Sequence, residues 1–268
     1  MTYELFIARR YLTAKRRQAF ISVITFISTL GITIGVMALI IAIALITGFQ
    51  RDVQDKILGS TSHIMVTDAS REGLADYEGL MDKIGRLKGV KSANPVVYEV
   101  VLLSGPAENR GVVLKGIDFD REKEFSPWLK ELERGSIPSP GLRRAGIIIS
   151  DDMSVATGVG VGDVVTVLTS PTSLSPLGLM PRPKRFLVTG IFNSGLYEFD
   201  SSTALVRLET AQEVFGLKER ISYIQVRIEN IFKAPQIGDE IKEIIPPLAY
   251  VTTWMELNKS LFSALKLE

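Results

Sequence analysis

The stretch that decides the fold is residues 18–50, QAFISVITFISTLGITIGVMALIIAIALITGFQ, which has no Lys, Arg, Asp or Glu in its 33 positions. A helix needs about 20 apolar residues to cross the roughly 30 Å hydrocarbon core of a bilayer. The stretch therefore predicts one transmembrane helix, with residues to spare for tilt or extension. The part of the chain after this stretch, residues 51–268, mixes polar and apolar residues and is expected to fold in water.

The charges that flank this stretch predict its orientation. Residues 1–17 carry five basic side chains against one acidic side chain, whereas residues 51–56 are balanced. The positive-inside rule then places the N-terminus in the cytoplasm and the larger domain on the other side of the membrane. An A-x-A sequence at residues 42–44 leaves a cleaved signal peptide as an alternative, although the apolar run before it is longer than such peptides normally have.

The segment before the span, residues 2–17, fits an amphipathic helix at the inner membrane surface or, alternatively, a basic tail that only sets the topology. After the span, residues 49–58 predict a continuation of the same helix, with Gly59 as its stop.

Small and hydroxyl-bearing residues follow one face of the predicted membrane helix. Gly31 and Gly35 form a G-x-x-x-G motif, which lets a second helix approach closely. The hydroxyl groups recur about every 3.6 residues and can bond across such a contact. We therefore expect a partner helix on this face. The hydroxyl-bearing residues of the stripe are Ser22, Thr25, Thr29 and Thr33.

Residues 51–268 alternate short strand patterns with short helical patterns, which predicts an α+β domain. We expect two lobes, with the proline-containing, irregular residues 119–144 near their boundary. The predicted strands are residues 63–67, 96–103, 111–117, 145–150, 161–169, 185–192, 202–208, 222–228 and 249–254. The predicted helices are residues 75–89, 151–158, 209–216, 234–245 and 255–268.

The residues that usually carry chemistry are scarce. The chain has no cysteine and a single histidine, His63, which excludes disulfides and thiolate metal sites and predicts a structural histidine. The glycines at 158, 160 and 162 lead into a strand and not a helix, so they indicate a turn and no phosphate loop. The adjacent Asp151 and Asp152 do not face each other on a helix, and capping by Ser150 or Asp151 explains one of them. We expect no catalytic site, no metal and no cofactor.

One loop, residues 170–184 (SPTSLSPLGLMPRPK), is informative because it joins two predicted strands as a hairpin extension. Its four prolines stiffen it and remove backbone donors. Apolar residues lie toward its tip, and basic residues follow at its base. This pattern is typical of a recognition arm; the alternative is that the loop folds back over its own domain.

Several motifs together resemble one family. They resemble the LolC/LolE permeases of lipoprotein-releasing ABC transporters, within the larger group that shares a MacB-like periplasmic core domain. The motifs are FIARRYL (6–12), ISTLGITIGVMAL (27–39), TGFQRDVQDKILG (47–59), LKGID (114–118) and SPLGLMPRPKRF (175–186), together with the closing WMELNKSLFSALKLE (254–268).

The resemblance implies an inner-membrane permease subunit without catalysis of its own, which pairs with a second permease subunit as a homo- or heterodimer. ATP hydrolysis would occur in a separate cytoplasmic ABC ATPase. The complex would take its lipoprotein substrate from membrane lipid and pass it to a periplasmic lipoprotein carrier, with no nucleic acid involved. The implied parts are a cytoplasmic helix (1–17), transmembrane helix 1 (18–50), a two-lobed MacB-like periplasmic domain (51–253) with a hook hairpin (170–185), and an amphipathic helix (254–268) leading to a second span.

The resemblance also implies two sets of site residues. The carrier-binding hook would use Pro171, Leu174, Pro176, Leu177, Leu179, Met180, Pro181, Pro183 and Lys184. The membrane helix would contribute Thr25, Ser28, Gly31, Gly35 and Met37 to helix packing and to the cavity that receives the lipid.

Three alternatives remain open. The hairpin looks like one permease type and the span like the other, so the chain is LolC-like, LolE-like or a combined homodimeric permease. A MacB- or FtsX-like efflux or division-type permease is the second alternative, and we expect no Pro-rich carrier-binding hairpin there. A single-span anchored periplasmic sensor or enzyme is the third, and the coding sequence after residue 268 discriminates it.

Overall fold

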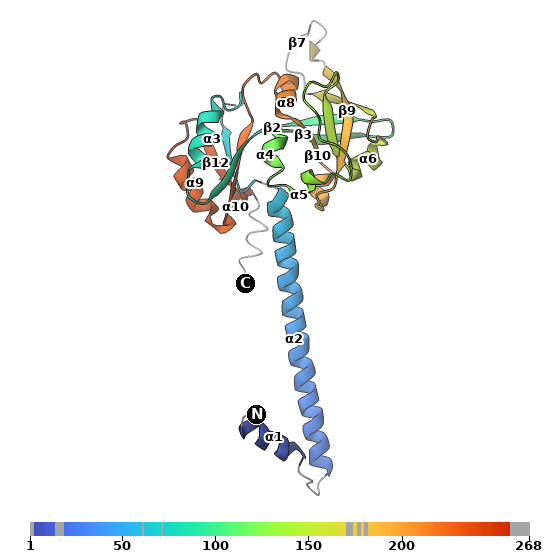
Figure 1. Ribbon diagram of the computed structural model, residues 1–268, viewed down its shortest axis with the longest axis vertical. Helices are drawn as coiled ribbons and strands as arrows, with labels where there is room; N and C mark the ends of the chain where they lie inside the picture. The colour runs from blue at the N-terminus through green and yellow to red at the C-terminus, as the bar shows by residue number, and fades with distance from the viewer. Residues whose placement is uncertain are drawn as a thin grey trace. The chain divides into compact units, whose positions relative to one another are not determined.

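This computed structural model describes most of the chain, and Figure 1 shows its elements in order. The described residues are 3–13, 19–60, 62–70, 72–169, 174–175, 178–179 and 182–257. They divide into two units, one up to Gln54 and one from Asp55 onward.

The first unit contains helix α1 (Tyr3–Thr13) and most of the 42-residue helix α2 (Ala19–Ser60). Within α2, the 28 residues Ile21–Gly48 have a mean hydropathy of 2.7, so this helix is long and apolar enough to cross a membrane. At 1.5 Å per residue they extend about 42 Å, which exceeds the hydrocarbon core of a bilayer. The predicted continuation past Gly48 is confirmed, since α2 ends at Ser60, one residue beyond the predicted stop.

The second unit is built on a ten-stranded sheet in the order β12-β1-β11-β2-β3-β10-β5-β9-β4, with β6 pairing both β2 and β9. These two pairings close strands β2, β3, β10, β5, β9 and β6 into a ring. The strands are β1 (Ile64–Asp68), β2 (Val90–Ser104), β3 (Asn109–Ile117), β4 (Arg134–Gly135), β5 (Gly146–Ser150), β6 (Val164–Thr169), β9 (Arg182–Phe192), β10 (Thr203–Arg207), β11 (Tyr223–Ile228) and β12 (Ala249–Thr253).

Strand β2 belongs to both parts of this sheet. Its first half pairs with β11, its residues from Val96 onward pair with β3, and its last three residues pair with β6. The domain therefore combines an open sheet, β12-β1-β11-β2, with a closed barrel, and β2 continues from one into the other. This is the form that the two predicted lobes take.

One face of the open sheet and the inside of the barrel share a continuous apolar core. Helices α3 (Tyr77–Gly85), α8 (Leu208–Phe215) and α9 (Ala234–Lys242) pack on it. Helix α8 approaches β3 so closely that a Cβ on Gly116 would lie 2.3 Å from the Ala211 Cβ. Glycine at 116 is thus required by packing.

A second apolar cluster lies on the opposite face of the sheet. It is covered by three four-residue helices, α4 (Phe119–Glu122), α5 (Pro127–Lys130) and α7 (Tyr197–Asp200). The centroid of the Trp128 ring lies 4.9 Å from the ring centroid of Phe192 and 5.7 Å from that of Phe199. The prediction that residues 119–144 are irregular is therefore wrong for α4 and α5, which are too short to show a helical period.

Local details around helix α6 (Asp151–Thr157) test the turn predictions. Ser150 caps this helix by accepting a hydrogen bond from the Met153 N–H at 3.1 Å, while Asp151 instead pairs with Arg134. Capping therefore does not account for either aspartate. The glycine turn is confirmed: Gly158 (φ 70°) ends α6, and Gly162 (φ 96°) turns the chain into β6.

The described chain closes with a short 3-10 helix, η1 (Ile231–Lys233), then α9, β12 and helix α10 (Trp254–Leu257). Most of the predicted helix over residues 255–268 lies outside the described residues.

Candidate functional site

The predicted hairpin extension grows from two long paired strands. β6 and β9 pair antiparallel from Val164 opposite Leu187 to Thr169 opposite Arg182. Residues 170–181 therefore connect the two strands of a β-hairpin, as the sequence predicts. The six paired positions give this connection a hydrogen-bonded stalk.

Within the connection, strands β7 (Leu174–Ser175) and β8 (Gly178–Leu179) form a second, two-stranded sheet. Leu174 lies opposite Leu179, so these two predicted hook residues occupy facing positions on the backbone. The other predicted residues of the hairpin tip lie outside the described residues; they are Pro171, Pro176, Leu177, Met180 and Pro181.

The base of the hairpin is exposed and charged. Pro183 and Lys184 both lie on the surface of β9. The Lys184 Nζ lies 3.5 Å from the Glu213 Oε1 on α8, and the two side chains are 47% and 79% exposed. An ion pair this exposed contributes little stability. Glu213 has no signal in the sequence that links it to the hairpin, because the contact is made only in the folded domain.

An exposed apolar strip runs along β2 beside the hairpin stalk, where Leu102 lies opposite Leu168 of β6. Tyr98, Val100 and Leu102 alternate along β2 and are 46%, 61% and 38% exposed. The sequence VVYEVVLL predicts the strand but not this strip, because apolar residues occupy both of its faces.

The threonine hydroxyls on the small-residue face of α2 bond within the helix. Thr25, Thr29 and Thr33 each donate to the carbonyl four residues earlier, at 2.9, 2.7 and 2.8 Å. The helix backbone therefore accepts these hydroxyl protons, and bonding of the hydroxyls across a helix contact stays a prediction.

The glycines of this face agree with close helix packing. A Cβ added at Gly31 or Gly35 meets no other described atom within 4 Å, so the groove above them is open. Ser28 lies on the same helix, and Met37 is 53% exposed.

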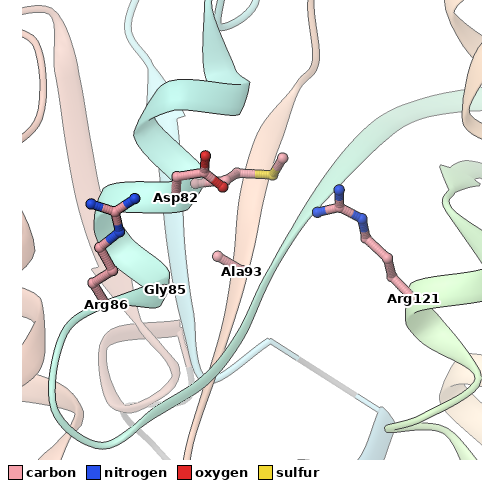
Figure 2. A pocket seen from close by; sticks show the side chains of 6 residues that line it. Asp82, Gly85, Arg86, Ala93 and Arg121 are labelled. Atoms are coloured by element: carbon pink, nitrogen blue, oxygen red, sulfur yellow. The ribbon is translucent and has the colours of Figure 1, made fainter.

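The domain has a cleft between α3 and α4, of about 360 Å³ (Figure 2). Arg86, the C-cap residue of α3, and Arg121 of α4 approach it from opposite sides, and Ala93 of β2 lies between them. This cleft cannot be seen in the sequence, since its lining comes from three separate elements.

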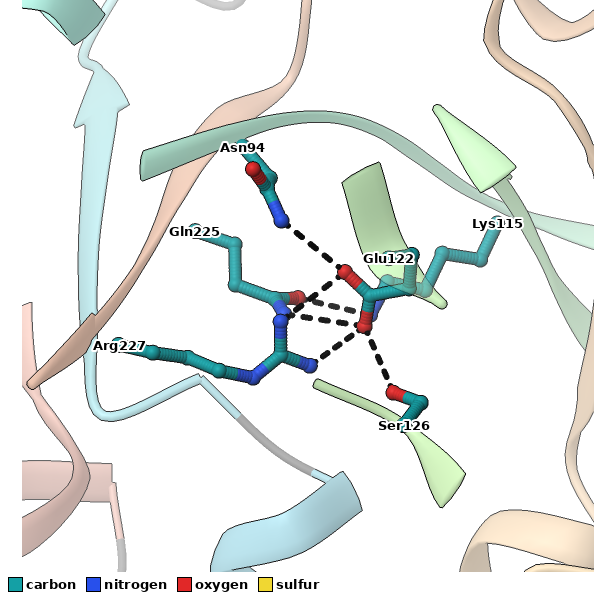
Figure 3. A network of polar contacts seen from close by, with 6 residues as sticks. All are labelled: Asn94, Lys115, Glu122, Ser126, Gln225 and Arg227. Carbon is teal, nitrogen blue, oxygen red and sulfur yellow. Dashed lines mark hydrogen bonds and ion pairs between the residues drawn. The ribbon is translucent and has the colours of Figure 1, made fainter. Parts of the chain in front are cut away.

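A buried network of polar side chains holds α4 against the sheet (Figure 3). The Glu122 carboxylate accepts two hydrogen bonds from Arg227, one of them at 3.0 Å, and both residues are 4% exposed. Asn94 and Ser126 donate to the same carboxylate at 3.3 and 3.1 Å. Beside it, the Lys115 Nζ donates to the Gln225 Oε1 at 2.9 Å.

Burial and charge shift the pKa values in this network. Burial lowers the pKa of Lys115 to about 8, although the Glu122 carboxylate acts in the opposite direction. Burial alone would raise the pKa of Glu122, but the hydrogen bonds and charge of Arg227 hold it below its ordinary value. All three charged groups are shielded from solvent, so the network stabilises the fold and cannot reach a substrate.

The single histidine and the possible metal ligands remain to be placed. The His63 Nδ1 accepts a hydrogen bond from the Ile228 N–H at 3.0 Å, and His63 is buried. This geometry agrees with a structural histidine. In the part of the chain that the structure describes, no group of three or more His, Cys, Asp or Glu side chains is placed to hold a metal.

The sequence pattern of the MacB-like periplasmic core domain matches residues 25–244, which is most of the chain. The chain belongs to this family. The predicted MacB-like domain is thereby confirmed. The solved periplasmic region of MacB from Actinobacillus actinomycetemcomitans aligns with a TM-score of 0.47 and 10% identity, over 79% of this chain and 95% of that chain, a likeness too loose to carry an argument.

Curated relatives match almost the whole length of this chain. The lipoprotein-releasing system transmembrane protein LolC of Neisseria meningitidis serogroup B is 30% identical over 99% of this chain and 64% of its own. LolC of Xylella fastidiosa (strain Temecula1) is 32% identical over 98% and 63%. LolE of Haemophilus influenzae is 22% identical over 95% and 62%. The resemblance to LolC and LolE is confirmed, and the chain spans just under two thirds of the length of these relatives.

Proposed function

We propose that this chain is the N-terminal part of a permease subunit in an ABC transporter that releases lipoproteins from the inner membrane and passes them to a periplasmic carrier. The observation that carries this proposal is the 30–32% identity to LolC proteins over nearly the whole chain. The hairpin stalk of β6 and β9 supports lipoprotein release over a MacB- or FtsX-like efflux or division role, for which no such arm is expected.

The proposed organisation keeps residues 1–17 in the cytoplasm, 18–50 in the membrane, 51–253 in the periplasm and 254–268 as a helix leading toward a second span. The strand pairing supports it. Ile64 at the start of β1 lies opposite Thr253 at the end of β12, so the chain enters and leaves the sheet at the same end. A domain inserted between two membrane helices needs this arrangement.

The proposed function requires two further protein partners, one in the membrane and one in the cytoplasm. A second permease subunit would pack on the Gly31–Gly35 face of α2, which is open to close helix approach. A separate cytoplasmic ATPase would hydrolyse ATP, and this chain would contribute no catalytic group.

The carrier would be gripped by the hook hairpin, residues 170–185. Its paired stalk fixes the base of the arm, while β7 and β8 form a sheet of their own at its end. Within the domain, Figure 1 shows β7 on the side opposite α10, the end of the described chain. An arm on that side would be free to meet a soluble partner.

Leu177→Asp tests the hook. A charge placed in a desolvated anchor pocket costs several kcal/mol, so binding of the periplasmic carrier in a pull-down with the assembled transporter should fall by at least about tenfold. Release of lipoprotein from membrane vesicles to added carrier should fall with it. Leu142→Asp is the matched control, because Leu142 is a 40% exposed leucine elsewhere on the domain. Carrier binding and release equal to those of the control would refute the proposal.

A further inference from the structure

Part of one edge of β2 has no strand partner in the described part of the chain. Its first residues pair with β11 on one side, but β3 joins the other side only where Val96 lies opposite Ile117. After Ile117 the chain turns into α4. Among the described residues, no strand pairs with the edge that runs from Val90 to Pro95.

The backbone groups on this edge can be assigned from the alternation of the strand. The Val96 carbonyl accepts from the Ser222 N–H at 2.9 Å, and the Tyr98 N–H donates to the Ser222 Oγ at 2.9 Å, so these residues direct their polar groups toward β11. Backbone groups alternate between the two edges of a strand. The N–H and C=O of Ala93, which is only partly buried, therefore face the unpaired edge.

At Ala93 this edge borders the cleft between α3 and α4. Asp82, Gly85 and Arg86 line the α3 side of the cleft, Arg121 lines the α4 side, and Ala93 is part of the lining. Figure 2 shows the two arginine side chains on opposite sides of Ala93.

The charged residues that line the cleft are two arginines, Arg86 and Arg121, and one aspartate, Asp82. The Arg121 Nε lies 3.2 Å from the Asp118 Oδ2, and no other carboxylate among the described residues forms an ion pair with Arg121. No carboxylate among the described residues forms an ion pair with Arg86 either. Two guanidinium groups thus share the cleft with one carboxylate, Asp82, and guanidinium groups bind carboxylates in a forked geometry.

We propose that this cleft binds an extended acidic segment of a polypeptide by strand addition to β2. The backbone of the segment would pair with Ala93, and its carboxylates would pair with Arg86 and Arg121. A phosphate or a lipid headgroup fits less well. Such a ligand offers acceptors to the arginines but no donor for the Ala93 carbonyl. The site is separate from the hook hairpin and does not depend on the carrier.

The proposal is tested by fluorescence anisotropy with the full chain in detergent micelles. The probe is a labelled peptide of about nine residues that alternates threonine and valine and carries two glutamates; its partner probe carries two lysines instead. We expect the acidic peptide to bind at least about tenfold more tightly. Arg86→Gln and Arg121→Gln should each weaken it by about tenfold, equivalent to about 1.4 kcal/mol. Lys83→Gln, an exposed lysine of α3 outside the cleft lining, is the matched control.

A separate variant tests whether the peptide pairs with the backbone of β2. Ala93→Pro removes the N–H on the free edge without removing a bond to β11, so peptide binding should be lost while the unfolding midpoint stays close to that of the parent chain. A peptide with alternate backbone nitrogens methylated should also fail to bind the unmodified protein, which tests pairing even if Ala93→Pro unfolds.

Three results would overturn the proposal. The first is equal binding of the acidic and basic peptides, and the second is unchanged affinity in both arginine variants. The third is self-association of the chain that Ala93→Pro abolishes, because the edge would then be occupied by a second copy of this chain.

Discussion

Replacing Glu122 with alanine should destabilise the domain more than any surface change. Glu122 is the only acidic member of the buried network, and it faces Arg227 and Lys115, which are 4% and 8% exposed. Its removal leaves two buried cations without a counter-charge and takes an acceptor from Asn94 and Ser126. Breaking a buried ion pair from one side costs about 3–5 kcal/mol. We expect a loss of this size in the free energy of unfolding.

The chain suits a fluorescence assay of this loss. Its two tryptophans, Trp128 and Trp254, both lie in the second unit, and the membrane stretch has none. Trp128 stacks on Phe192 and Trp254 is 2% exposed, so both indoles should report unfolding of the domain. Urea titration of the full chain in detergent micelles then measures the domain alone, through the shift of its midpoint.

Glu124→Ala is the matched control, because Glu124 is an exposed glutamate two residues along the chain. It should change the free energy of unfolding by no more than about 0.5 kcal/mol. Glu122→Ala with Arg227→Met should recover part of the loss, since one unpaired cation is then removed. If Glu122→Ala costs no more than Glu124→Ala, the network does not hold α4 to the sheet.

Two further predictions concern charge and helix packing. Between pH 8 and 10.5 the unfolded chain keeps the Lys115 proton that the folded domain has released, so stability should rise with pH by up to about 3 kcal/mol. Urea midpoints across this range should show the rise, and Lys115→Met should abolish it; identical profiles would contradict the shifted pKa. Gly31→Leu should fill the open groove on α2 and weaken co-purification with the partner permease subunit. If as much partner is recovered as with Ile32→Leu, the glycine face does not form the contact.

Much of the fold can be predicted because its signals are local. A run of 33 uncharged residues is enough to predict the apolar helix, and alternation with turn residues predicts most strands of the domain. Closure of the barrel cannot be predicted this way. It depends on β6 pairing with β2, and that register is set by residues far apart along the chain, such as Leu102 and Leu168, which lie opposite each other.

Of the candidate sites, one can be predicted from the sequence and two cannot. The hairpin is visible in the sequence because its prolines interrupt two strand patterns, and the stalk agrees with it. The cleft and the buried network are not visible, because each gathers single residues from several elements. Arg121 and Glu122 are neighbours in the sequence, yet one lines the cleft and the other is buried beneath α4.

The shared strand β2 also determines where this domain can tolerate a change of length. Side chains alternate along a strand, so one residue inserted near Val97 would move every later side chain of β2 to the opposite face of the sheet. Val101 and Leu103 would leave the barrel core, and Val100 and Leu102 would replace them. The connection between β6 and β9 carries no such constraint, because the paired stalk is complete before it begins. Relatives should therefore differ in the length of this arm while β2 keeps its length.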